Sequence, residues 1–72
     1  MPPAALSAAL DRLELTQSGA ARRWRINLRT LQRWLSGEVP IPEWATHLIA
    51  AEQRIAELEA ELAAIHAAAM AV

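Results

Sequence analysis

Arginine is the only strongly basic residue type in this chain, and most of its arginines lie between residues 22 and 33. Arg29 and Arg33 are four residues apart, which places them one turn apart on the same side of a helix. The planar guanidinium group donates two hydrogen bonds at once, a geometry that matches a phosphate or the N7 and O6 atoms of guanine. The spacing therefore indicates nucleic-acid contact through one face of a short helix.

The formal net charge of -1 conceals an uneven distribution along the chain. Residues 1–42 carry six arginines against three acidic residues, a net charge of +3, whereas residues 43–72 carry one arginine against five glutamates, a net charge of −4. Nucleic acid attracts the first segment and repels the second. We therefore predict two parts, a DNA-binding head over residues 1–42 and a C-terminal segment over residues 43–72 with a different role.

Length and composition argue against several other classes of protein. A chain of 72 residues is too short for a self-sufficient enzyme. It has no cysteine, its two histidines lie far apart, and it has no glycine-rich phosphate loop, so we expect no catalytic residues, metal, cofactor or small-molecule ligand. The N-terminus is unlike a signal peptide and no apolar run approaches the ~20 residues of a membrane span, which predicts a cytoplasmic protein.

The apolar spacing predicts an all-α fold, because Val, Ile and Thr never alternate as they do in strands. Three short helices are expected over residues 4–13, 17–24 and 28–35. Asn27 is expected to cap the third helix by accepting from backbone N–H groups near Thr30, and Gly37 to end it in a left-handed conformation. Thr16 is expected to cap the second helix.

A fourth, long helix is predicted from Trp44 to Ala69, after a proline-containing break. Its apolar residues alternate steps of three and four, which is a heptad pattern. The a positions are Leu48, Ile55, Leu62 and Ala69, and the d positions are Ala51, Leu58, Ile65 and Val72.

A repeat of 3.5 residues favours a partner helix, and the head is too small to cover this face. We therefore predict a homodimer with an interface formed by Leu48, Ala51, Ile55, Leu58, Leu62 and Ile65. Parallel and antiparallel pairing both remain open, and the alternative is a tail that folds onto its own head or extends into solvent. Trp24, Trp34 and Trp44 are expected to anchor the core of the head.

Several short matches within residues 15–37 point to a known family. They are Leu-Thr-Gln at the start, Ala21, Ile26, the capping Asn27, Thr30-Leu31, and the Arg-Trp-x-x-Gly ending at Gly37. This segment, about a third of the chain, resembles the helix-turn-helix of the phage lambda-type repressor and Cro family. The plan of a small head with a dimerising tail is also similar to small phage autoregulators, including the repressors that accompany anti-CRISPR genes.

The resemblance implies a lambda-repressor-like head that contacts double-stranded DNA through its third helix. By position, the implied base contacts are Leu28, Arg29, Gln32 and Arg33, and the implied phosphate contacts are Gln17, Arg22, Arg23 and Arg25. The chain departs from the family at Arg25, where glycine is usual, and at Leu10 and Leu35, where relatives often have an ion pair. Because both ends of that pair are apolar together, we expect the two leucines to pack in one core.

These observations favour a sequence-specific transcriptional repressor that binds an inverted-repeat operator as a homodimer and regulates its own operon. The alternative is an antitoxin-like or adaptor module whose C-terminal helix captures a different protein. A third, less favoured interpretation is a structural helical oligomer in which the arginines serve solubility.

Overall fold

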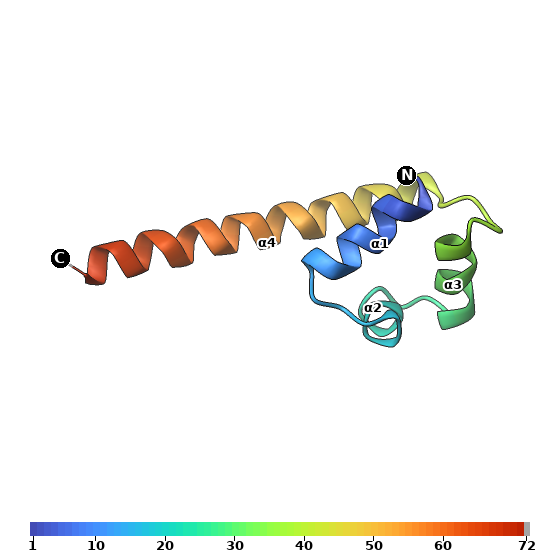
Figure 1. Cartoon of the computed structure of the whole chain (residues 1–72), viewed down its shortest axis with the longest axis horizontal. Helices are drawn as coiled ribbons and strands as arrows, with labels where there is room; N and C mark the ends of the chain where they lie inside the picture. The colour runs from blue at the N-terminus through green and yellow to red at the C-terminus, as the bar shows by residue number, and fades with distance from the viewer. Residues whose placement is uncertain (72) are drawn as a thin grey trace.

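The computed structural model describes residues 1–71, and within them the chain forms four helices and no strand (Figure 1). The helices are α1 (Pro3–Arg12), α2 (Gln17–Arg23), α3 (Leu28–Ser36) and α4 (Glu43–Met70). The predicted all-α class is confirmed, and each helix begins and ends within two residues of its predicted bounds. Val72, a d position of the predicted heptad pattern, lies outside the described residues.

Local chemistry explains where α2 and α3 begin and end. The Thr16 hydroxyl accepts a hydrogen bond from the Gly19 N–H at 3.0 Å, and the Asn27 side chain accepts from the Arg29 N–H at 2.8 Å. Both caps were predicted, although Asn27 bonds the N–H two residues on rather than the one at Thr30. Gly37 ends α3 at φ 81, the expected left-handed conformation.

The molecule is elongated, with extents of 52 × 20 × 18 Å. Helix α1 lies along the first part of α4, α3 packs against α1 and α2, and the rest of α4 continues alone to the C-terminus (Figure 1). At 1.5 Å per residue the 28 residues of α4 span roughly 42 Å, which accounts for most of the longest dimension. Helix α3 lies at the end of the molecule opposite the C-terminus (Figure 1).

All four helices contribute to the single core of the head. Leu6 of α1, Leu31 of α3 and Ile49 of α4 are completely buried. Ala45 is also buried, so the first two turns of α4 pack as part of the head although they lie beyond residue 42. The remaining buried residues are Ala9, Leu10, Ala20, Ala21, Trp24 and Trp34.

One expectation about the core is wrong, and another is confirmed in part. Trp44 was expected inside it, but its side chain is 54% exposed and its ring meets the edge of Trp34 at a centroid distance of 5.9 Å. It covers the core from outside, because Ala45 and Ile49 occupy the inward face of α4. Leu35 is only partly buried, although it packs against the core that holds Leu10.

Two residues other than glycine adopt a left-handed backbone conformation in the head. Arg25, between α2 and α3, has φ 54, and Glu14, between α1 and α2, has φ 56. Arg25 therefore keeps the geometry for which glycine is usually chosen, at a cost of about 1–2 kcal/mol. Nothing in the sequence indicated the same conformation at Glu14.

Candidate nucleic-acid interface

Helix α3 has one buried face and one exposed face. Leu31 and Trp34 are buried against the other helices, Thr30 and Leu35 beside them are partly buried, and Gln32 and Arg33 between them face solvent. The exposed residues include all four predicted base contacts, Leu28, Arg29, Gln32 and Arg33. Leu28 is 37% exposed, an apolar side chain left in water at the first position of the helix. The sequence-predicted residues are thus brought together on a single surface, which we call the α3 face.

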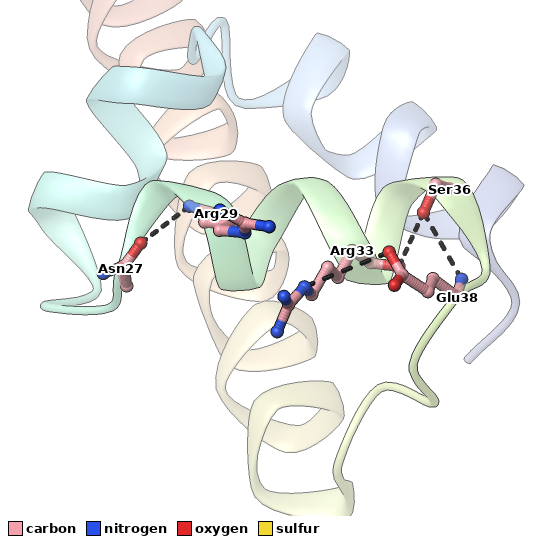
Figure 2. A network of polar contacts seen from close by, with 5 residues as sticks. All are labelled: Asn27, Arg29, Arg33, Ser36 and Glu38. Atoms are coloured by element: carbon pink, nitrogen blue, oxygen red, sulfur yellow. Dashed lines mark hydrogen bonds and ion pairs between the residues drawn. The ribbon is translucent and has the colours of Figure 1, made fainter.

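The two arginines of the α3 face differ in their surroundings (Figure 2). The side chain of Arg29 has no ion-pair partner among residues 1–71, and its backbone N–H is held by Asn27. Arg33 lies 4.0 Å from the carboxylate of Glu38, and both side chains are largely exposed. The loop after α3 is fixed by Ser36, whose hydroxyl accepts from the Glu38 N–H at 3.3 Å and donates to the Arg33 carbonyl at 3.0 Å. This fixed turn keeps Glu38 beside Arg33.

The predicted phosphate-contacting residues lie on α2 and the turn that follows it. Gln17 is exposed at the first position of α2, where unpaired backbone N–H groups favour an anion. Arg22 and Arg25 are exposed as well, Arg25 in the turn that leads into α3. With Arg23 on the last turn of α2, this group supplies positive charge beside the α3 face.

Arg23 makes a contact that sequence reasoning missed. Its Nε donates to Oε2 of Glu52 on α4 at 2.8 Å, and Glu52 is the more buried partner, with a side chain 17% exposed. The two residues are 29 positions apart, so no local pattern could pair them. The contact links α2 to α4. It pairs Arg23, which was expected to contact phosphate, with a carboxylate of the same chain.

Helix α4 presents the predicted heptad residues to solvent once it leaves the head. Ile55, Leu58, Leu62 and Ile65 are 53%, 41%, 55% and 62% exposed. Ala51 is exposed as well, whereas Leu48 is partly buried and packs against its own core. We call Ile55, Leu58, Leu62 and Ile65 the α4 seam, a row of four large apolar side chains without cover in a single copy.

Other chemistry is sparse in the part of the chain that the structure describes. Among residues 1–71 no three His, Asp or Glu side chains gather as a metal ion would require. Within the same residues no helix is both long and apolar enough to cross a membrane. A shallow groove runs between the end of α1 and α4, lined by Arg12, Leu13, Gln53, Ala56, Glu57 and Ala60.

Comparison with known proteins found no matching family model, no matching curated protein and no matching solved structure.

Proposed function

We propose that the chain is a sequence-specific transcriptional repressor that binds double-stranded DNA as a homodimer, with residues 15–37 acting as a helix-turn-helix. The α3 face carries the proposal, because Arg29, Gln32 and Arg33 form an exposed polar row directly above a buried apolar face. An α-helix with such a row fits the width of the major groove. The buried face of α3 holds this helix firmly against the rest of the head when it lies in the major groove.

The proposed roles follow the chemistry of each side chain. Arg29 and Arg33 each contact guanine through the guanidinium fork, Gln32 reads adenine, and Leu28 touches a thymine methyl group. Gln17 holds a phosphate at the start of α2, and Arg22 and Arg25 add backbone contacts that fix the register on the duplex. Arg23 reaches phosphate only when it leaves Glu52.

Repression and homodimer formation complete the proposal. A second copy covers the α4 seam, and two heads related by a two-fold axis bind an inverted repeat with half-site centres about 34 Å apart. Binding at a promoter excludes polymerase, which is why we favour repression over activation. The most economical target is the promoter of the chain's own operon.

Selection of bound duplexes from a random pool tests the proposal. We expect an enriched inverted repeat, and we expect Arg29→Ala or Arg33→Ala to cost about 1–3 kcal/mol on it and to relax base preference at one position in each half-site. Arg22→Ala weakens binding to all sequences alike and lowers the salt slope by about 0.9 for every phosphate that each copy no longer neutralises. Arg12→Ala, an exposed arginine at the end of α1 that the proposal assigns neither to DNA nor to the dimer, is the matched control and leaves binding unchanged.

One observation favours a second candidate function, an adaptor or antitoxin-like module. The α4 seam is apolar enough to hold a different protein as well as a second copy. If selection recovers no enriched repeat and the Arg29→Ala and Arg33→Ala variants bind DNA as the wild type does, the DNA-binding proposal fails and the adaptor is favoured.

A further inference from the structure

We infer that the α4 helices of two copies pair in parallel and in register, so that both heads lie at one end of the assembly. The inference rests on the proposed homodimer and adds its direction. The partner is a second copy of this chain, seated on the α4 seam. Three features of the molecule support this arrangement.

The first feature is that the α4 seam and the head occupy different sides of α4. At about 100° per residue, the seam lies roughly 140° around the helix from the face that holds Ala45 and Ile49. Those two residues are buried against the head, whereas Ile55 to Ile65 on the seam are exposed. A second helix can therefore lie along the seam without displacing α1. In a parallel pair, the α4 helix of one copy does not collide with the head of the other.

The second feature is the charge beside the α4 seam. In a parallel pair each g position meets the e position five residues later on the partner. Arg54 then faces the partner's Glu59, and Glu61 faces the partner's His66, which can donate a hydrogen bond to the carboxylate. Glu59 and Glu61 are both exposed and so available for these contacts.

The antiparallel alternative has the opposite electrostatics. The register that covers all four seam residues sets Ile55 against the partner's Ile65 and Leu58 against the partner's Leu62. It also sets Glu59 against the partner's Glu59 and Glu61 against the partner's Glu61. Like charges directly opposite each other destabilise a pair, so charge favours the parallel arrangement.

The third feature is the position of α3 at the end of the molecule opposite the C-terminus (Figure 1). Parallel pairing sets two α3 faces at one end and directs both acidic tails away from DNA. In the antiparallel register, the two Glu43 residues that begin α4 would lie about 50 Å apart along the helix axis. That separation exceeds the roughly 34 Å of one DNA turn, so two heads would not reach successive major grooves on one face.

The seam residues themselves bear on the number of helices. Ile55 at a with Leu58 at d is the order that favours two strands. Leu62 at a with Ile65 at d is the reverse order, which favours larger assemblies. The test therefore measures the mass of the assembly together with its direction.

Cysteine cross-linking tests the direction, since the chain has no cysteine of its own. Ala51→Cys and Ala69→Cys change exposed alanines on the a/d side of α4. One of the two variants carries a tag, so that the homodisulfides and the mixed disulfide differ in mass. The variants are mixed and equilibrated in a glutathione buffer. In a parallel pair each variant forms a disulfide with itself, whereas in the antiparallel register residue 51 meets the partner's residue 69 and only the mixed disulfide forms.

The outcomes separate this inference from the proposed function. Homodisulfides of both variants at dimer mass support parallel pairing, and the mixed disulfide alone overturns it. A monomer or a tetramer at micromolar concentration in sedimentation equilibrium also overturns it. Binding of the wild-type chain to the selected inverted repeat is measured separately. An antiparallel dimer that binds this DNA would support the proposed function and contradict the inferred parallel pairing.

A charge exchange provides a second, independent measurement. Arg54→Glu sets a glutamate against the partner's Glu59, and we expect it to raise the dimer Kd about three- to tenfold, because two symmetry-related contacts are each weak. Arg54→Glu with Glu59→Arg restores the parallel contact and returns the Kd to near the wild-type value. In the antiparallel register the double variant gains nothing from the second substitution, so lack of rescue would contradict the inference.

Discussion

Ile49 and Ile55 lie six residues apart on the same helix, yet Ile49 is completely buried and Ile55 is 53% exposed. Both are isoleucines in continuous α-helix, so neither helix propensity nor side-chain size accounts for the difference. What differs is the neighbour, since α1 covers the side of α4 that holds Ile49 and nothing in a single copy covers the α4 seam. The head is therefore stabilised within one chain, whereas the part of α4 beyond the head presents apolar area that a single copy leaves exposed.

The largest expected effect comes from introducing charged residues into the α4 seam. Leu58→Glu with Leu62→Glu removes four leucine side chains from the proposed dimer interface, each worth about 1.5–3 kcal/mol when fully buried. We expect the dimer Kd to rise at least about a thousandfold, because the missing burial alone exceeds ~4 kcal/mol. Sedimentation equilibrium reports the change as a return to monomer mass.

The matched control for this variant places the same charges on another side of the helix. Ala64→Glu with Ala67→Glu changes two exposed residues away from the α4 seam and is expected to leave the dimer intact. Trp24 and Trp34 are buried in the head, so their fluorescence follows its folding. We expect the head to stay folded in both variants and to show a cooperative unfolding transition. A wild-type chain that is already a monomer across micromolar concentrations would refute the distinction between the two parts of α4.

The next effect comes from truncating a buried leucine in the head. Leu31 is completely buried, so Leu31→Ala is expected to lower the free energy of unfolding by about 2–4 kcal/mol. Urea denaturation followed by tryptophan fluorescence measures it, and the reduction should be the same at all protein concentrations. Leu62→Ala is the contrast, because its cost should appear only at concentrations where the dimer forms. Equal, concentration-independent reductions would show that the α4 seam is covered by its own chain.

The sequence predicted the features that depend on neighbouring residues. Thr16, Asn27 and Gly37 cap and end helices through contacts two to four residues away, which a local pattern contains. Helical spacing also placed Arg29 and Arg33 on one face, which is exposed, and Trp34 was expected in the core, where it is buried. The facing of the side chains follows from the 3.6-residue period of a helix, and the caps follow from the unpaired backbone groups at helix ends.

The features that depend on distant residues were missed or wrong. The heptad pattern drew attention to one side of α4, so the buried side with Ala45 and Ile49 was overlooked and Trp44 was wrongly assigned to the core. The pair between Arg23 and Glu52 joins residues 29 positions apart. Helix periodicity gives the faces of α4 but does not say which face the head takes, since that depends on how α1 to α3 pack.

A smaller effect concerns strain within the head. Arg25→Gly relieves the left-handed backbone of Arg25, worth about 1–2 kcal/mol, but it makes the unfolded chain more flexible. We expect a net gain of about 0.5 kcal/mol in the free energy of unfolding, measured by urea denaturation. Arg22→Gly, inside α2, is the control of opposite sign and should cost about 1 kcal/mol. A decrease in stability in both variants would mean that Arg25 contributes an interaction larger than its strain.

The smallest effect on stability tests whether α4 withholds an arginine from DNA. Glu52→Gln removes the charge that holds Arg23, and because Arg23 is 56% exposed we expect stability to fall by less than about 1 kcal/mol. The released guanidinium becomes available to phosphate, so DNA affinity should rise and the salt slope should steepen by about 0.9 for each copy.

Glu57→Gln separates that local release from a general change in charge. It also removes one negative charge from α4 and breaks an ion pair, the one with Arg54 at 3.3 Å, but it leaves Arg23 bound to Glu52. Because long-range attraction to DNA changes equally in the two variants, only release of Arg23 can make their salt slopes differ. Titrations at several salt concentrations compare them on one duplex. Equal slopes would mean that Arg23 stays away from phosphate even when it is free, leaving its contact with Glu52 as a tie between the head and α4.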